Sequence, residues 1–328
     1  MKTAAQKTAA LDPSAGDRLP YAGHLDDHTV MTRGGDLIQM IQVDGVAFET
    51  ADSETLNHMA AVRDVVMRGI ANSSLMLYCH VIRRQVTAEL TGAQPDGFVR
   101  DLDDAWQQQL RGKKLYINDM VLMLVRRPAQ GKIGFFDRLT KWGNGTRNSA
   151  ERLADQTREL RELDAARTNL LSALSRYGPR LLGRYHDANG TCSEPLEILS
   201  ALYNGEMQPV LEPTGDAGQY LPYKRISFGL DALELKGASA NTSRFGAIVS
   251  IKDYPAYTAP GMLDNLLRLP HELTMTESFA FIDRQIADER IGLALRRLRA
   301  ASDETTTLRQ GLLGAKDDLT GGAAAYGE

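Results

Sequence analysis

The chain has 328 residues, of which 43% are hydrophobic, 24% charged and 6% aromatic, so it is long enough for two folded lobes. Lys and Arg number 38 against 42 Asp and Glu, a net charge of −4, whereas a general nucleic-acid binder carries a basic surplus that neutralises phosphates. The two cysteines, Cys79 and Cys192, exclude a disulfide framework and fit a reducing compartment. The longest apolar run, near 75–82, is far shorter than the roughly 20 residues of a membrane helix.

The first half of the chain predicts a hairpin followed by alternating helices and strands. Residues 1–18 lack any hydrophobic period and are expected to form a disordered leader without a secretory signal. The glycines of Arg33-Gly34-Gly35-Asp36 permit a tight turn between strands at 28–32 and 37–43. The later elements are a helix at 53–69, a strand at 74–82, a helix at 98–110 and a strand at 116–125. The apolar composition of these two strands indicates central positions in a sheet that is covered on both faces.

A long, highly charged helix is expected at 149–177, with its leucines on one stripe. After it the pattern predicts strands at 181–186, 225–228, 232–235, 245–252 and 273–281 and helices at 194–203, 262–269 and 282–300. The fold class is therefore α+β, with mixed or antiparallel sheets, crossover helices and an order close to ferredoxin-like. We expect two lobes that lean toward this fold, at 19–175 and 176–300, followed by a connector at 301–328.

A search for catalytic motifs gives no catalytic, cofactor-binding or metal-binding assignment. The sequence contains no P-loop, and Gly131-Lys132 is followed by Ile133 where a magnesium-binding hydroxyl would stand. The segment His24-Leu25-Asp26-Asp27-His28 could place metal ligands on one face of an extended chain, but a polar entry into the first strand is the favoured interpretation. Cys79 and His80 are neighbours in a strand, so their side chains should point to opposite faces rather than form a catalytic pair.

One segment stands out by its charge. Residues 126–148 contain six basic residues and one acid, and Phe135, Leu139 and Trp142 recur at helical spacing. This pattern is typical of a short basic amphipathic helix that binds a bilayer surface or a partner groove. The alternative is that the aromatic side chains pack back on the parent domain. The candidate contact residues are Lys132, Phe135, Phe136, Arg138, Leu139, Lys141 and Trp142.

Several short blocks, in order and at matching spacing over about 19–328, resemble the CagE/TrbE/VirB family of type IV secretion and conjugation ATPases. The similarity is strongest toward the C-terminal side, in Asp253-Tyr254-Pro255, in 258–264 and in Leu267-Arg268-Leu269-Pro270-His271-Glu272-Leu273. Weaker blocks are Leu19-Pro20-Tyr21 with His24, Gly34-Gly35-Asp36, 42–49, 80–84, 116–122 and Ser278-Phe279. On this resemblance, residues 19–300 form the N-terminal domain of the family, and Tyr326-Gly327-Glu328 begins a segment that leads toward the RecA-like ATPase domain.

The resemblance implies an assembly role. ATP and Mg²⁺ are expected for the full-length protein, but the RecA-like domain with Walker A and Walker B is not in this chain, so the chain alone should not hydrolyse ATP. The family N-terminal domain lies at the cytoplasmic face of the bacterial inner membrane and contacts the small inner-membrane subunit, scaffold subunits and other ATPase subunits. A full-length hexamer that powers pilus biogenesis and transfer of DNA or protein is expected.

Two alternatives remain open. One is a self-contained cytosolic enzyme of unrecognised class, which nucleotide turnover by this chain would reveal. The other is a DNA-handling module, which the net acidity disfavours. That module would require the arginines of 282–300 to gather on one face, namely Arg284, Arg290, Arg296, Arg297 and Arg299; a solvated charged helix is the simpler interpretation.

Overall fold

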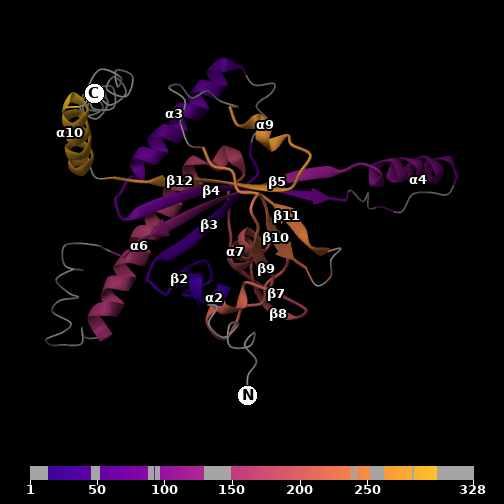
Figure 1. The fold of residues 1–328 in the computed structure, drawn as a ribbon, viewed down its shortest axis with the longest axis horizontal. Helices are drawn as coiled ribbons and strands as arrows, with labels where there is room; N and C mark the ends of the chain where they lie inside the picture. The colour runs from indigo at the N-terminus through magenta and orange to yellow at the C-terminus, as the bar shows by residue number, and fades with distance from the viewer. Residues whose placement is uncertain are drawn as a thin grey trace.

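A computed structural model describes residues 14–45, 52–87, 92, 97–128, 149–237, 239, 242–251, 262–282 and 284–300. The fold is α+β, with antiparallel strand pairs (Figure 1). Its main sheet has seven strands in the order β1-β2-β3-β5-β4-β12, with β6 also paired to β3. These strands are β1 (Tyr21–His24), β2 (Val30–Thr32), β3 (Leu37–Val43), β4 (Leu75–Val86), β5 (Leu115–Arg126), β6 (Arg180–Leu181) and β12 (Leu273–Ala280).

Helices cover both faces of this sheet, as the apolar composition of the strands predicted. On one face, Leu163, Ala166 and Leu170 of α6 pack against residues such as Leu37 and Leu124 of the sheet. On the other face, Leu196, Ile198 and Leu199 of α7 are buried with Ile38 and Met40. The helices are α2 (Ala15–Arg18), α3 (Ser53–Gly69), α4 (Phe98–Arg111), α6 (Ser149–Ala173), the 3-10 turn η1 (Ser175–Tyr177), α7 (Glu194–Asn204), α8 (Ala217–Tyr220), α9 (Asp264–Leu267) and α10 (Arg284–Ala300).

The first half of the chain has the strand order of a ferredoxin-like unit. Along the sequence it runs β3-α3-β4-α4-β5-α6-β6, and in space β6, β3, β5 and β4 lie side by side, each antiparallel to its neighbour. Since β5 is inserted between β3 and β4, helix α3 crosses over the sheet between two parallel strands. The predicted elements at 37–43, 53–69, 98–110 and 116–125 are therefore confirmed.

The described residues after 182 do not repeat this unit. They form the hairpin β7 (Arg184–Asp187) and β8 (Gly190–Ser193) and a three-stranded meander of β9 (Arg225–Phe228), β10 (Leu233–Lys236) and β11 (Arg244–Gly246). Instead of joining a second sheet, β12 pairs with β4 over its whole length. The boundary expected near residue 175 stays a prediction, but β6 and β12 hydrogen-bond to strands that precede it.

Three predicted elements differ in the structure. The strand expected at 181–186 is split into β6 and β7, which residues 182–183 separate. Gly183 passes so close to His28 that a Cβ would lie 2.5 Å from its Nδ1, and beyond it β7 pairs with β8 instead of the main sheet. The strand expected at 245–252 ends at Gly246, and Val249 beyond it is 92% exposed. Residues 15–18, expected within a disordered leader, form α2, which begins with a capping box at Ser14.

Candidate docking surface

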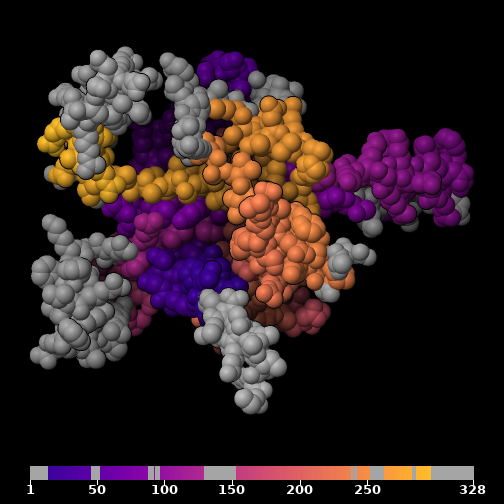
Figure 2. Space-filling model, viewed as in Figure 1, coloured from indigo at the N-terminus to yellow at the C-terminus, as the bar shows by residue number. Residues whose placement is uncertain are grey.

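The most prominent feature of the surface is an arm that projects from the sheet. Strands β4 and β5 pair from Leu75↔Arg126 out to Val86↔Leu115, whereas β12 stops at Arg83 and β3 stops at Met120. The outer end of the β4–β5 ribbon therefore has no other strand beside it among the described residues. It carries helix α4, which stands clear of the body in Figures 1 and 2. We call α4 and this outer end of the ribbon the arm.

The apolar face of α4 is exposed. Phe98, Leu102 and Trp106 recur every fourth residue and so lie along one side of the helix, with exposed fractions of 78%, 56% and 55%. Val99, which flanks them, is 47% exposed, and no residue of α4 is buried. An amphipathic helix normally buries its apolar stripe against its own core, so this exposed stripe is typical of an interaction surface.

Charges on the arm are separated along its length. Asp101, Asp103 and Asp104 lie in the N-terminal half of α4, while Arg111 ends the helix and Lys113 and Lys114 follow it. This arrangement complements the dipole of the helix itself, which favours acids at the N-terminus and bases at the C-terminus. With Arg100 counted, the N-terminal half of α4 carries three acids and one base, so the outer part of the arm has a net charge of −2 and the inner part is basic.

The inner end of the arm is fixed by the segment that precedes β12. Arg83 donates from Nε to the Leu269 carbonyl at 3.0 Å, and its guanidinium lies 4.7 Å from the centre of the Tyr116 ring. The Tyr116 hydroxyl donates to the Pro270 carbonyl at 2.8 Å. One residue from each strand of the ribbon thus binds the backbone at 269–270. These contacts hold the direction in which the arm projects.

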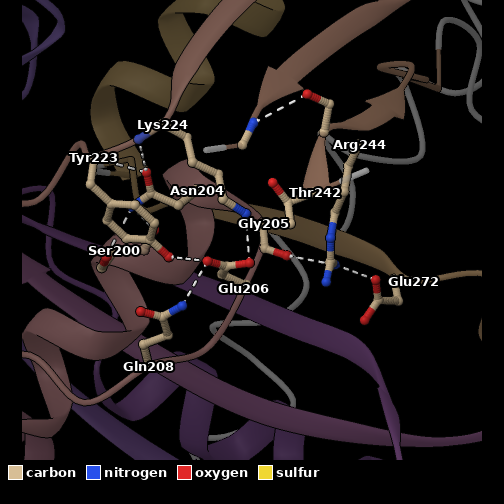
Figure 3. Close-up of polar contacts among 12 residues, drawn as sticks. Ser200, Asn204, Gly205, Glu206, Gln208, Tyr223, Lys224, Thr242, Arg244 and Glu272 are labelled. Carbon is tan, nitrogen blue, oxygen red and sulfur yellow. Dashed lines mark hydrogen bonds and ion pairs between the residues drawn. The ribbon is translucent and has the colours of Figure 1, made fainter. Parts of the chain in front are cut away.

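Glu272 extends this anchor to the meander. Its Oε1 accepts from the backbone N–H of Gln85 at 3.1 Å, and its Oε2 is paired with Arg244 of β11. Arg244 also donates to the Gly205 carbonyl at 3.3 Å (Figure 3). Gly205 has a φ of 71° and closes α7 in the left-handed conformation that glycine adopts without strain. The Arg244–Glu272 pair therefore connects the arm, the meander and the end of α7.

Beside Gly205, Asn204 is fully buried and makes five hydrogen bonds (Figure 3). Its Nδ2 donates to the Ser200 carbonyl, the Ser200 hydroxyl and the Leu221 carbonyl at 2.9 to 3.0 Å. Its Oδ1 accepts from the backbone N–H groups of Tyr223 and Lys224 at 3.2 and 3.0 Å. Both the donor and the acceptor groups of this amide are used, so the amide fixes the segment before β9 against the end of α7.

A buried ion pair lies next to this amide. Lys224 Nζ is 2.6 Å from Glu206 Oε2, and the lysine side chain is 7% exposed. The Tyr223 hydroxyl donates to Glu206 Oε1 at 2.7 Å. Burial favours the neutral acid, but hydrogen bonds from Lys224 and Tyr223 outweigh it and hold the pKa of Glu206 below its usual value. Burial, together with Glu206, raises the pKa of Tyr223. Glu206, Lys224 and Tyr223 therefore hold the segment that follows α7 to the residues that precede β9.

The histidines at 24 and 28 bind other parts of the protein rather than converging on a metal. His24 Nε2 lies 2.6 Å from Ser193 Oγ, and His28 Nδ1 lies 3.0 Å from the Leu182 carbonyl. Asp26 accepts from the backbone N–H groups of residues 28 and 29, and Asp27 pairs with Arg184. No group of three metal-ligating side chains occurs among the described residues. The polar segment thus joins β1 and β2 to the second half of the chain.

The contact between His24 and Ser193 resembles a nucleophile and its base, but its surroundings are those of a helix cap. Ser193 is fully buried, and its Oγ accepts from the backbone N–H of Leu196 at the start of α7. Burial lowers the pKa of His24. Both hydroxyl and imidazole therefore serve the packing of α7 on β1.

Cys79 and His80 lie on opposite faces of β4, as alternation predicted. Cys79 packs in the cluster below α6, and its burial raises the pKa of the thiol to about 12. The His80 ring stacks parallel to Tyr78 on the other face, and its Nδ1 lies 2.9 Å from the Thr276 hydroxyl of β12. The thiol and the imidazole cannot act as a pair.

The contact residues predicted from the basic segment lie outside the described residues. These are Lys132, Phe135, Phe136, Arg138, Leu139, Lys141 and Trp142, and their role stays a prediction. The helix expected at 282–300 is present as α10, but side chains are described for only Arg290 and Arg296 of its five arginines, so the clustering of charge there also stays untested. Within the described part of the chain, no helix is both long and apolar enough to span a bilayer.

Comparison with known proteins identifies similar sequences. The family described as "Type IV secretion system ATPase VirB4/TrbE, N-terminal domain" matches residues 28–133, and "CagE, TrbE, VirB family, component of type IV transporter system" matches residues 180–327.

The curated relatives are longer than this chain. It is 29% identical to "Type IV secretion system protein virB4" of Bartonella henselae, over 95% of this chain and 39% of that protein. It is 32% identical to "Protein virB4" of Agrobacterium fabrum, over 92% of this chain and 37% of that protein. The chain thus spans about two fifths of the length of these relatives.

Proposed function

Because the chain belongs to the VirB4/TrbE family of type IV secretion ATPases, we propose that it is an assembly portion of such an ATPase. In this role it docks onto other subunits of the secretion machine and does not itself bind nucleotide. ATP and Mg²⁺ would be handled by a RecA-like domain elsewhere in the whole protein, since the sequence of this chain contains no P-loop.

The observation that carries this proposal is the exposed apolar face of α4 on an anchored arm. Phe98 and Trp106 are 78% and 55% exposed, and aromatic side chains are the residues that most often dominate binding energy at interfaces. Arg83 and Tyr116 fix the ribbon that presents them. A rigid support reduces the entropy lost on binding. The arm is therefore suited to hold a partner in a defined position.

The partners we propose are the small inner-membrane subunit, the scaffold subunits and other ATPase subunits of the secretion machine. Attachment would be peripheral, at the cytoplasmic face of the bacterial inner membrane, and the basic segment 126–148 would contribute to it through its aromatic residues. In the whole protein these contacts would support a hexamer that powers pilus biogenesis and the transfer of DNA or protein. The net charge of −4 agrees with protein partners rather than with sequence-specific nucleic acid.

Co-purification with the inner-membrane and scaffold subunits tests the proposal. Serine substitution of Phe98 and Trp106 together, or of Phe135 and Trp142 together, should reduce recovery of at least one of these subunits. Val65→Ser is the matched control, because Val65 on α3 is 61% exposed but lies on the body. Unchanged recovery with both double variants would contradict the docking role. ATP turnover by this chain alone would contradict the assembly role and favour a self-contained enzyme.

A further inference from the structure

We propose that the outer edge of β12 binds an extended segment of a different protein subunit, which joins the main sheet as an added strand and places a basic side chain opposite Glu277. The proposal rests on the assembly role proposed above and adds a docking site that is separate from the arm. The occupant is a peptide that is extended, apolar at alternate positions, and carries a Lys or Arg among them. Strand addition of this kind is a common mode of peptide recognition.

Strand β12 ends the main sheet in an open edge. Its eight residues pair with β4 on one side, from Leu273↔Arg83 to Ala280↔Met76, without a bulge. On the other side no strand lies beside it among the described residues, and Figure 2 shows this part of the chain at the surface, as the orange-yellow band that leads to α10. Every second residue of an antiparallel edge strand points its N–H and C=O outward. These groups make no hydrogen bond with any other described residue, so a further strand can bind them.

The opposite end of the sheet is protected, whereas β12 is not. Strand β1 has only four residues, and its pairing with β2 shifts register after Tyr21. Helix α8 lies so close to it that a Cβ on Gly218 would be 3.1 Å from the Tyr21 carbonyl. Short length, irregular pairing and a covering element are ways in which proteins block an edge. By contrast, β12 has eight residues, regular pairing and no Pro, Lys or Arg, so it would promote aggregation unless a partner covers it.

The side chains of β12 define the pattern of the added strand. Leu273, Met275 and Phe279 lie on the same face of the sheet as Cys79, where α3 and α6 pack. The residues between them, Thr274, Thr276 and Ser278, lie on the other face and are exposed. A strand that continues both faces therefore needs apolar residues at every second position and small polar residues between them.

Glu277 adds a requirement for charge. It is half-buried and lies opposite Cys79 in the ladder, where its charge adds to burial in raising the pKa of that thiol. Within the described part of the chain this carboxylate makes no hydrogen bond or ion pair. Covering it with a wholly apolar strand would bury a charge without a partner, which is costly. A Lys or Arg directly opposite would pair with it, so the edge selects a strand by charge.

Other occupants fit this edge less well. A bilayer offers no partners for backbone N–H and C=O groups, and open sheet edges do not occur in its hydrocarbon region. Because β12 has no basic residue, it is a poor site for nucleic acid, and the β12 edge of a second copy could not neutralise Glu277. The next described element is helix α10, which begins at Arg284, so β12 is not followed directly by a strand that pairs with it as a hairpin.

Fluorescence anisotropy with a labelled peptide, Thr-Val-Thr-Lys-Thr-Val-Thr with blocked ends, tests the edge on the chain alone. In either strand direction this symmetric peptide can place Lys opposite Glu277 and Val opposite Met275 and Phe279. Saturable binding is expected. Replacing Lys with Glu in the peptide should weaken binding about tenfold, because an attractive cross-strand pair becomes a repulsive one. No saturable binding, or equal binding of both peptides, would overturn the proposal.

A charge exchange on the protein identifies the site. Glu277→Lys should reverse the preference, so that the Glu peptide binds more tightly than the Lys peptide. Glu289→Lys is the matched control, because Glu289 is exposed on α10 and its substitution changes the net charge equally; it should bind as the wild type does. If circular dichroism shows that Glu277→Lys is misfolded, Glu277→Gln, which keeps the shape of the side chain, should bind both peptides equally. An unchanged preference in the folded Glu277 variant would contradict the assignment.

Backbone methylation distinguishes an added strand from binding through side chains alone. N-methylation of the Val and Lys residues removes the N–H groups along one edge of the peptide, and N-methylation of the inner Thr residues removes them along the other. Only one of these two peptides should lose binding, since a strand pairs with β12 through a single edge. Hydrogen–deuterium exchange should slow at 273–280 and stay unchanged in the meander at 225–246. Loss of binding with both methylated peptides, or with neither, would refute an added strand.

Co-purification with the other secretion subunits tests the source of the segment. Glu277→Lys should lower the recovery of a subunit, and Glu289→Lys should not; equal recovery with both would count against a separate subunit. The whole protein should still bind the Lys peptide, and loss of that binding would assign the edge to a strand from its own downstream part instead. Serine substitution of Phe98 and Trp106 on the arm should leave peptide binding unchanged. Failure of the arm and failure of the β12 edge are therefore measured separately.

Discussion

Replacing Asn204 with Ala should destabilise the protein by about 3 to 4 kcal/mol. The substitution removes the Oδ1 acceptor of two backbone N–H groups, those of Tyr223 and Lys224, which lie 3.2 and 3.0 Å away. It also removes the donor to the Leu221 carbonyl. Leaving a buried polar group without a partner costs about 1–3 kcal/mol, so the two N–H groups alone account for most of the loss.

Urea unfolding followed by far-UV circular dichroism measures this effect, with the slope checked for a change that would signal lost cooperativity. Asn189→Ala is the matched control, because it removes the same atoms from an exposed turn and should cost less than about 0.5 kcal/mol. A loss below about 1 kcal/mol in the Asn204 variant would refute the view that this amide fixes β9 to α7.

Three further predictions concern the buried ionisable groups. Burial lowers the pKa of His24 below its ordinary value of 6.5. The contribution of His24 to the free energy of unfolding should therefore be fully present above pH 6.5 and be lost as the pH falls below it. In urea titrations at stepped pH, His24→Asn should make the free energy of unfolding depend less on pH. Glu162→Ala should lower the free energy of unfolding by about 2 kcal/mol, because it removes the carboxylate that lies 2.8 Å from Nη2 of Arg126, whose side chain is 6% exposed. Adding Arg126→Met should restore most of this free energy in the same assay. No recovery would rule out the unpaired buried cation as the cause of the loss. Finally, neither Cys79, whose pKa is raised to about 12, nor the buried Cys192 should react with a thiol reagent at pH 8 until denaturant is added; rapid reaction of the native protein would contradict the burial of both thiols.

The elements of the first half could be read from the sequence because local signals agree there with the tertiary structure. Asp52, directly before the helix expected at 53–69, caps α3 through its side chain, which accepts from the Thr55 N–H. Helix α7 ends at Asn204, one residue beyond the helix expected at 194–203, and Gly205 caps it. Strand β4 was predicted from its apolar residues, but it runs on through Arg83, Arg84 and Gln85 to Val86. These polar residues belong to a ribbon outside the core, where hydrophobic content carries no signal.

The pairing of β12 could not be predicted, since it joins residues about 190 positions apart. Nothing in the composition of Leu273–Ala280 distinguishes a strand of a second sheet from an added strand of the first. The arm was missed for a related reason. An amphipathic pattern at 98–110 predicts a helix with an apolar face, but not whether that face meets the core of its own chain.

The position of β12 has a consequence for synthesis on the ribosome. Strand β4 lies between β5 and β12, so its outer edge stays open while the ribosome makes the next two hundred or so residues. An open edge of this length is a template for pairing with other chains, and nascent chains emerge at about 5–20 residues per second. The edge would thus remain unpaired for roughly 10 to 40 seconds at these rates. Polysomes that carry several nascent copies should therefore be the place where this chain depends most on chaperones.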